Sequence, residues 1–191
     1  MADRVCIVSG GNSGIGFELC RGMAAAGYRV VMVSRGAERG QPALEKLQAE
    51  FGDSVEMMLC DMSDLENISK LYAEFSAKFD RLDVLLNNAG AMWGRREKTA
   101  QGHEMTFGVN HLGYFVMAQA FLPLLKATEG SRIINTASEA HRMANLKLNN
   151  PNWENKYYSQ WRTYGNSKLC NILFTRELAR KLEGTGITTH C

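Results

Sequence analysis

The chain has 191 residues, a length that fits one hydrophobic core and therefore one domain. Hydrophobic residues make up 45% and charged residues 22% of the sequence, which excludes a disordered, collagen-like or disulfide-dense chain. The 22 basic and 20 acidic side chains leave a net charge of +2, and the basic residues form no stripe along one segment, so no nucleic-acid partner is expected.

Short apolar runs rich in Val, Ile and Leu alternate with longer segments of helical periodicity. The runs lie near residues 5, 30, 55, 83 and 132, and each is apolar nearly throughout, as parallel strands covered on both faces should be. The predicted helices cover residues 17–26, 42–51, 65–79, 107–126 and 168–182. This pattern predicts an α/β fold with a doubly wound parallel sheet and helices on both faces.

Local signals mark the ends of two of these helices. Gly27 follows the first helix, where a glycine can adopt positive φ, and Ser63 with Glu66 matches a capping box that opens the third. There is no repeat, low-complexity tract or Pro/Ser-rich linker. We therefore expect one domain over residues 1–191.

Cysteines and apolar segments bear on the compartment. The five cysteines form an odd set without a CxxC pair, and the four histidines show no spacing typical of a metal site. We expect reduced thiols in packing positions and no metal ion. The N-terminus lacks the features of a secretory signal, and no segment approaches the ~20 apolar residues that span a bilayer. A cytoplasmic protein without a membrane span is the expectation.

A glycine-rich turn, Ser9-Gly10-Gly11-Asn12-Ser13-Gly14-Ile15-Gly16, joins the first strand to the first helix. Gly10 permits a tight turn, while Gly14 and Gly16 let the backbone approach a pyrophosphate. Free N–H groups and the helix dipole stabilise such an anion at a helix N-terminus. A glycine cluster alone also serves ordinary turns, but its place between strand and helix favours a nucleotide site.

The glycine spacing resembles the TGxxxGIG motif of the short-chain dehydrogenase/reductase family, with Ser9 in place of threonine. Other blocks of that family follow in the same order: Asn87-Asn88-Ala89-Gly90, Asn110 in VNHLGYF, Ser138, and Tyr164-Gly165-Asn166-Ser167-Lys168. The resemblance spans residues 4–190, and FGVNHLGYF and YGNSKLCNILFTRELARKLEGTGI are most similar to the retinol-dehydrogenase-like branch. It implies a Rossmann fold with strand order 3-2-1-4-5-6 that binds NAD(P).

The resemblance also implies which residues contact the cofactor. They come from the glycine turn, from the segments after the third and fourth strands and from the catalytic pair: Gly10, Asn12, Ser13, Gly14, Ile15, Gly16, Asp61, Met62, Asn88, Ala89, Gly90, Tyr164 and Lys168. Asp61 and Met62 would contact the adenine. The alternative for Asp61 is an ordinary loop carboxylate.

The choice of cofactor depends on Arg35, which follows the second strand about twenty residues past the glycine turn. NAD enzymes generally carry an acid at this point that binds the ribose 2′-hydroxyl. An arginine can instead bind a 2′-phosphate, so NADP(H) is preferred and NAD(H) is the alternative. Ser13 leaves that alternative open, because some NADP-preferring relatives have an additional Arg or Lys in the glycine turn.

Tyr164 and Lys168 are four residues apart in a segment expected to be helical, so their side chains share a face one turn apart. A phenol exchanges its proton at neutral pH only where its anion is stabilised, and a neighbouring ammonium provides that. Tyr-xxx-Lys occurs by chance in many helices, but its register with the other blocks predicts Tyr164 as a general acid/base. By resemblance, Lys168 also holds the nicotinamide ribose.

Two more residues complete the expected catalytic set. Ser138 ends the fifth strand, at the sheet edge where open α/β folds bind ligands, and its hydroxyl suits a hydrogen bond to the substrate oxygen. The family usually has two adjacent serines, whereas Ala137 precedes Ser138 here. Asn110 resembles the family asparagine that kinks its helix and holds a water of the proton relay. The ordinary alternative is a helical asparagine without that role.

The stretch between Ser138 and Tyr164 carries four aromatic residues, Trp153, Tyr157, Tyr158 and Trp161. They either wall an apolar substrate pocket or anchor a surface loop, and the loop with Met92 and Trp93 has the same ambiguity. Family members generally continue past this length, and the last residues of this chain resemble the start of a sixth strand. We expect either a fragment of a longer enzyme or a truncated variant.

These features predict an oxidoreductase that transfers a hydride between NADP(H) and a small-molecule carbonyl or alcohol, expected to be lipophilic. The alternative is a catalytically impaired nucleotide-binding or interaction module. A light-driven reductase related to protochlorophyllide reductase shares parts of the pattern but not its cysteine-bearing active-site text. The family often dimerises through the helices after the fourth and fifth strands, so the resemblance allows a homodimer.

Overall fold

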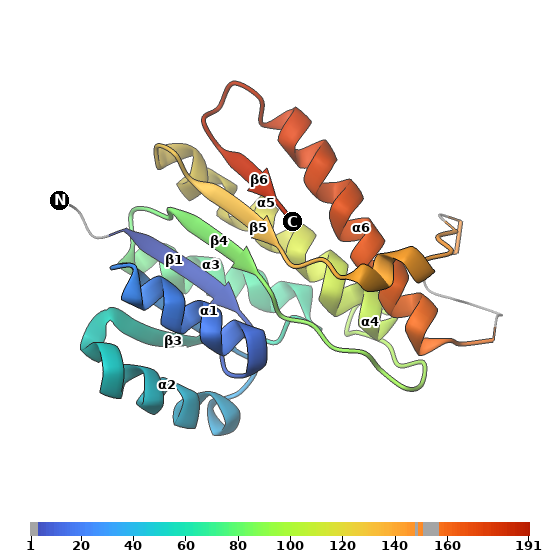
Figure 1. Ribbon diagram of the computed structural model, residues 1–191, viewed down its shortest axis with the longest axis horizontal. Coiled ribbons are helices and arrows are strands. Elements are labelled where there is room, and N and C mark those ends of the chain that lie inside the picture. Colours follow the sequence, from blue (N-terminus) through green and yellow to red (C-terminus); the bar gives the residue numbers. More distant parts are fainter. Residues whose placement is uncertain (1–3, 148, 151–156) are drawn as a thin grey trace.

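A computed structural model describes residues 4–147, 149–150 and 157–191. Six parallel strands form one sheet in the order β3-β2-β1-β4-β5-β6, which confirms the predicted order (Figure 1). The strands are β1 (Val5–Ser9), β2 (Arg29–Ser34), β3 (Val55–Leu59), β4 (Val84–Asn87), β5 (Arg132–Asn135) and β6 (Thr188–His190). The first five match the apolar runs of the sequence, and β6 lies where a sixth strand was expected to start.

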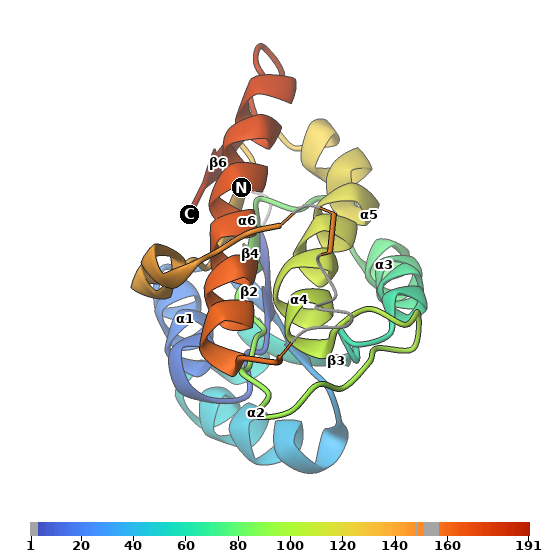
Figure 2. The ribbon, with the colours of Figure 1, turned by 90° about the vertical axis from the view of Figure 1, so that its right-hand side faces the viewer.

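The helices that connect these strands lie on both faces of the sheet. They are α1 (Gly14–Ala25), α2 (Ala37–Phe51), α3 (Leu65–Lys78), α4 (Met105–Phe107), α5 (Gly113–Ala127) and α6 (Gln160–Lys181). The described residues also form two 3₁₀ turns, η1 (Gly52–Ser54) and η3 (Glu139–Met143), and one turn of π-helix, called the π-turn, η2 (Gly108–Leu112). Figure 2 shows α1 on one side of the strands and α3 and α5 on the other.

Two apolar layers, one on each face of the sheet, form the core. The first packs β-strand side chains against α1 and α2, with Cys20 and Leu47 at its centre. The second packs the opposite strand faces against α3 and α5, where the ring of Phe121 meets the ring of Phe75 edge-on at 5.3 Å. Successive residues of β1, such as Cys6 and Ile7, therefore point into different layers. This explains why the strands are apolar throughout.

The observed helix boundaries correct three predictions. The capping box at Ser63 and Glu66 is wrong: Asp64 caps α3 by accepting from the N–H of Glu66 at 3.1 Å. The hydroxyl of Ser63 instead donates to the side chain of Asp61 at 2.8 Å. α2 begins five residues before Pro42, and α6 begins eight residues before Lys168. Tyr164 therefore lies inside a regular helix.

The described residues also show the end of α1 and the surroundings of the cysteines. Gly27 has a φ of +79° just past the end of α1, as its position predicted. All five cysteines are free, and four are buried in packing positions. None of the helices in the described ranges is long and apolar enough to cross a membrane. No group of three His, Cys, Asp or Glu side chains within those ranges is arranged to hold a metal ion.

Candidate functional site

The glycine turn packs so closely that side chains are excluded at several positions. Gly10 has a φ of +68°, and a Cβ there would lie 2.8 Å from the Cα of Ala89. A Cβ on Gly16 would overlap the carbonyl oxygen of Gly10. Gly14, at a φ of +53°, faces open space and begins α1. The turn therefore brings the backbone and the N-terminus of α1 to the carboxyl edge of the sheet.

The partial positive charge at the N-terminus of α1 is not compensated by a side chain of the first turn. Its N-cap, Ser13, makes no side-chain hydrogen bond to the helix, and no acidic residue lies in the first turn. The first N–H groups of a helix lack partners inside the helix, and the helix dipole favours an anion near them. Asn12 and Ile15 flank this opening, with Ile15 exposed at the surface. The arrangement fits a pyrophosphate.

Ser9 joins the glycine turn to the segment after β4. Its buried hydroxyl oxygen accepts from the N–H of Asn88 at 2.9 Å and from the N–H of Ala89 at 3.0 Å. The side-chain amide of Asn88 returns a hydrogen bond to the carbonyl of Ser9 at 3.1 Å. Either serine or threonine can provide this hydroxyl. The departure from the family motif at this position therefore preserves the connection.

The residues expected to bind the adenosine half of the cofactor differ in exposure and in hydrogen bonding. Arg35 is exposed directly after β2. One carboxylate oxygen of Asp61 accepts from the N–H of Ser63 at 2.9 Å as well as from its hydroxyl. This oxygen of Asp61 therefore binds its own loop, and the expected contact of Asp61 with the adenine stays a prediction. The side chain of Met62 is buried in the core, so it can contact a nucleotide only through its main chain.

A groove of about 800 Å³ lies between the glycine turn and α2. Asn12, Ser13 and Gly14 line one side, and Arg39 and Lys46 line the other. Neither Arg39 nor Arg35 forms an ion pair within the described part of the chain. The sequence analysis missed Arg39. Its spacing, four residues after Arg35 at the start of a helix, was the available signal.

Asn110 lies at the centre of the π-turn η2 and is fully buried. Its side-chain amide donates to the carbonyl of Ala91 at 2.9 Å, and its oxygen accepts from the N–H of Ala91 at 3.0 Å. The same amide also donates to the hydroxyl of Ser167 at 3.3 Å. The predicted helix 107–126 is therefore interrupted at Asn110, and π-turns of this kind are frequent at functional sites.

The π-turn leaves the main-chain carbonyl of Asn110 available to another residue. The side-chain amide of Asn171 donates to this carbonyl at 3.0 Å and to the carbonyl of Thr136 at 3.3 Å. Asn171 is fully buried and lies on α6, less than one turn after Lys168. It therefore ties η2, the end of β5 and α6 together. The sequence analysis did not identify Asn171, because an asparagine in a helix carries no signal of its tertiary partners.

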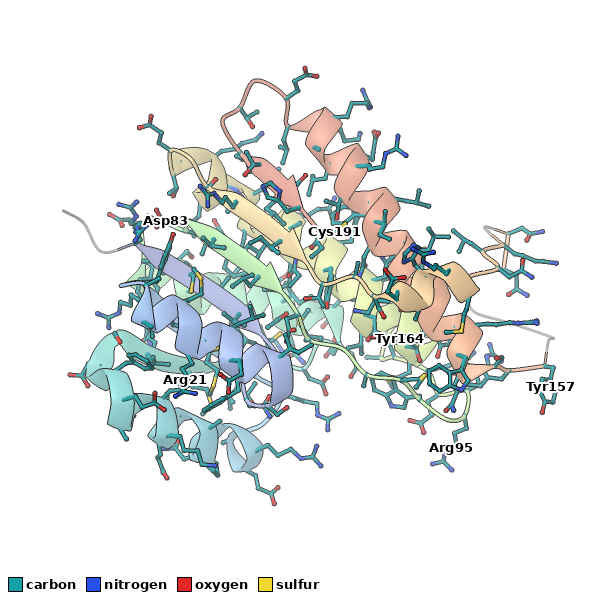
Figure 3. All side chains as sticks on the ribbon, viewed as in Figure 1. Arg21, Asp83, Arg95, Tyr157, Tyr164 and Cys191 are labelled. Atoms are coloured by element: carbon teal, nitrogen blue, oxygen red, sulfur yellow. The ribbon has the colours of Figure 1, made fainter. Side chains whose placement is uncertain are left out.

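Tyr164 and Lys168 lie on the same face of α6, and the ammonium nitrogen is 5.5 Å from the centroid of the Tyr164 ring. Figure 3 shows Tyr164 beside the segments that leave β4 and β5. The ammonium donates to the carbonyl of Thr136 at 2.9 Å. Lys168 is only 3% exposed, and burial lowers its pKa from 10.5 to about 8. No carboxylate in the described ranges lies within 4 Å of it.

Ser138 caps the 3₁₀ turn η3, against which α6 packs. Its hydroxyl oxygen accepts from the N–H of Ala140 at 3.2 Å, so the hydroxyl proton is left to donate. Gly165, next to Tyr164, allows the close approach of α6: a Cβ there would lie 2.6 Å from the carbonyl oxygen of Ala140. The structure thus brings Ser138, Tyr164, Lys168 and Asn110 to one end of the sheet.

The aromatic residues of the expected substrate segment divide into two groups. Tyr157 and Trp161 are 94% and 54% exposed, and Trp153 lies outside the described residues. Tyr158 is half-buried, and the single proton of its hydroxyl is shared between two acceptors, the carbonyl of Trp93 at 3.1 Å and the buried carboxylate of Glu104 at 3.0 Å. Tyr158 therefore anchors its segment to the loop after β4, while the two exposed rings are free to meet a ligand.

We predict that Ser9→Ala lowers the free energy of unfolding by about 2–3 kcal/mol, because two buried N–H groups lose their acceptor. Ser34→Ala is the matched control: it is equally buried at the end of β2, and its hydroxyl only donates to the carbonyl of Gly36. Urea denaturation measures both values. Equal losses for the two variants would contradict the proposed role of Ser9.

We predict that Lys168→Met is more stable than the parent at neutral pH by about 1–3 kcal/mol, since the buried ammonium is costly. The folded lysine releases its proton near pH 8 and the unfolded lysine near 10.5, so unfolding takes up a proton in this window. The stability of the parent therefore rises with pH there, and its difference from the variant shrinks.

Urea denaturation at a series of pH values checks this prediction. Lys126→Met, which removes an exposed lysine of α5, is the control and should show no such window. A difference between Lys168→Met and the parent that stays constant across the window would show that the ammonium is not desolvated in the folded protein.

Comparison with known proteins agrees with this geometry. Residues 4–191 match the family model described as short chain dehydrogenase. Retinol dehydrogenase 11 of Mus musculus is 41% identical over 188 residues, covering 98% of this chain and 59% of that protein. Retinol dehydrogenase 12 of Mus musculus is 38% identical with the same coverage. The chain therefore spans about three fifths of the length of these relatives.

Solved structures with the same fold include two at or above 30% identity. An uncharacterized protein from Mycobacterium paratuberculosis superposes with a TM-score of 0.85 at 34% identity, over 99% of this chain and 68% of that one. RhlG of Pseudomonas aeruginosa, solved as a complex with NADP, gives a TM-score of 0.79 at 30% identity, over 98% and 70%. The chain belongs to the short-chain dehydrogenase family, and within that family it resembles the retinol dehydrogenases.

Proposed function

We propose that the chain binds a nicotinamide cofactor over the glycine turn and exchanges a hydride and a proton with a carbonyl or alcohol substrate. One observation carries this proposal: the ammonium of Lys168, desolvated and held by the carbonyl of Thr136, lies 5.5 Å from the centroid of the Tyr164 ring, and no carboxylate among the described residues pairs with it. A lone positive charge next to a phenol stabilises the phenolate, as proton exchange requires.

The residues divide the work as follows. When bound, the reduced nicotinamide supplies the hydride. Tyr164 donates its proton to the substrate oxygen during carbonyl reduction and accepts it back during alcohol oxidation. Lys168 stabilises the phenolate form, and Ser138 donates a hydrogen bond to the same substrate oxygen. Asn110 holds the π-turn that fixes the distance between η2 and α6.

We infer that NADP(H) is preferred over NAD(H). Arg35 and Arg39 lie on the α2 side of the glycine turn and have no ion-pair partner among the described residues, so both can bind a 2′-phosphate. Ser13, which faces Arg39 across the groove, adds a hydroxyl donor. That RhlG was solved with NADP supports the same preference, while NAD(H) remains the alternative.

We further propose that the substrate is lipophilic. The names of the retinol dehydrogenases support this, as do three exposed apolar or aromatic side chains near the site, Met143, Tyr157 and Trp161.

We also propose a homodimer through α5 and α6, because these helices expose the apolar side chains of Phe115 and Leu173. The expected cytoplasmic location stays a prediction.

We predict that Tyr164→Phe lowers kcat/KM by about a hundredfold or more, because the general acid is lost, while NADPH affinity stays within about threefold. NADPH oxidation across a panel of lipophilic aldehydes and ketones measures turnover, and quenching of protein fluorescence measures binding. Tyr28→Phe, which alters a tyrosine directly before β2 and therefore at the opposite end of the strands from the site, is the control. Cofactor binding without turnover in the parent chain would instead favour a nucleotide-binding module.

We predict that Arg35→Ala and Arg39→Ala each weaken NADPH binding by about tenfold and leave NADH binding unchanged, since only NADPH carries the 2′-phosphate. Arg21→Ala is the control, because that arginine lies on α1 and pairs with Glu18 and Glu50. Titration of each variant with both cofactors checks this. Equal weakening of NADPH and NADH would contradict the proposed selectivity.

A further inference from the structure

Tyr114 is a fully buried residue of α5 that lies next to the catalytic pair. It follows Asn110 by four residues, so it lies about one helical turn beyond Asn110, as the second residue of α5. Its relative exposure is 0%, the same as that of Asn110. Tyr114 has no part in the proposed chemistry, but its ring flanks the ammonium of Lys168, which has no carboxylate of the described ranges within ion-pair distance.

The ammonium nitrogen of Lys168 lies over the ring of Tyr114, 5.5 Å from its centroid. It lies at the same distance from the centroid of Tyr164. Two phenol rings, one from α5 and one from α6, therefore flank a single cation. Both distances are within the ~6 Å at which the negative face of an aromatic ring attracts a cation, and this attraction is strongest where water is excluded.

The hydroxyl of Tyr114 has no well-formed hydrogen bond among the described residues, and its contact with the side chain of Thr136 is too poorly aligned to count as one. A buried hydroxyl without a partner costs stability, so the residue is not retained for a hydrogen bond within the fold. Burial, followed by the nearby Tyr164, raises the pKa of Tyr114, while Thr136 opposes the rise. Tyr114 therefore presents a neutral ring to Lys168, and its contribution lies in that ring.

Few other ionisable groups face this ammonium. His111 of η2 contacts the side chain of Asn171 at 2.9 Å, and burial lowers its pKa, which favours the neutral ring. Other ionisable groups on elements packed against α6 are Arg132 of β5, which is exposed at the start of that strand, and four side chains with partners of their own: Glu104 binds Tyr158, Glu139 pairs with Arg142, His141 contacts the carbonyl of Ser138, and His190 contacts Thr188.

We propose that Tyr114 is a positioning residue whose ring holds the Lys168 ammonium in its charged form beside Tyr164. Desolvation pushes Lys168 toward the neutral amine, and the carbonyl of Thr136 together with the two rings opposes it. The importance of this charge for turnover rests on the proposed function. The effect on Lys168 itself does not, and it is measurable without cofactor or substrate.

The test replaces Tyr114 with two side chains of similar size. Tyr114→Phe keeps the ring and removes only the unpartnered hydroxyl, so it should fold at least as stably as the parent. Replacement by 3,4,5-trifluorophenylalanine keeps the volume but withdraws electron density from the ring face. In protein labelled with ¹³C-lysine, the Cε signal of Lys168, assigned with Lys168→Met, is titrated from about pH 6 to about pH 11.

The parent and Tyr114→Phe should titrate near pH 8, and the fluorinated variant about half a unit to one unit lower. Above pH ~7 the fluorinated variant then carries less charge at Lys168. The basic limb of its pH profile for NADPH oxidation should therefore shift to lower pH by the same number of pH units. Identical titrations for the phenylalanine and trifluorophenylalanine variants would overturn the proposal.

The two readouts separate this proposal from the proposed function. A lowered Lys168 midpoint in a chain that does not oxidise NADPH would support the role of Tyr114 and reject the enzymatic function. Turnover in a chain whose Lys168 midpoint is the same with either ring would support the enzyme and reject the role of Tyr114. Circular dichroism and thermal melting of each variant verify that the two rings are compared in the same fold.

Discussion

The site depends on one charge, the ammonium of Lys168, which the fold has removed almost completely from water. Such burial favours the neutral amine and lowers the pKa of Lys168 to about 8, and within the described part of the chain the ammonium donates to one acceptor, the carbonyl of Thr136. A carboxylate partner would stabilise the cation more strongly, but it would also neutralise the field that acts on Tyr164. A carbonyl and aromatic ring faces hold the ammonium without that loss.

Much of the surrounding structure serves to bring α6 close enough for this contact. Gly165 lets the helix approach η3, and the amide of Asn171 joins α6 both to Thr136 and to the π-turn. The π-turn in turn is fixed by the side chain of Asn110, which binds both main-chain groups of Ala91. Since Ser9 binds the residues just before Ala91, the glycine turn and the catalytic helix belong to one continuous hydrogen-bonded framework.

The sequence predicted the parts of this framework that follow from local rules. Apolar runs located five strands, and motif spacing indicated Gly10, Gly16 and Tyr164. Sequence reasoning did not identify residues that act through distant partners. Asn171 and Tyr114 look like ordinary helical residues until α5 and α6 are packed together. The capping box failed for a local reason, because Asp61 competes for the hydroxyl of Ser63. The roles of the cofactor residues remain predictions.

A crystal structure of this chain with NADPH would test the central claim most directly. The account predicts the pyrophosphate at the N-terminus of α1 between Gly10 and Gly16, and the nicotinamide ribose within hydrogen-bond distance of Lys168 and Tyr164. A cofactor bound with its nicotinamide away from these two side chains, or a Tyr164 hydroxyl directed away from the nicotinamide, would contradict the account.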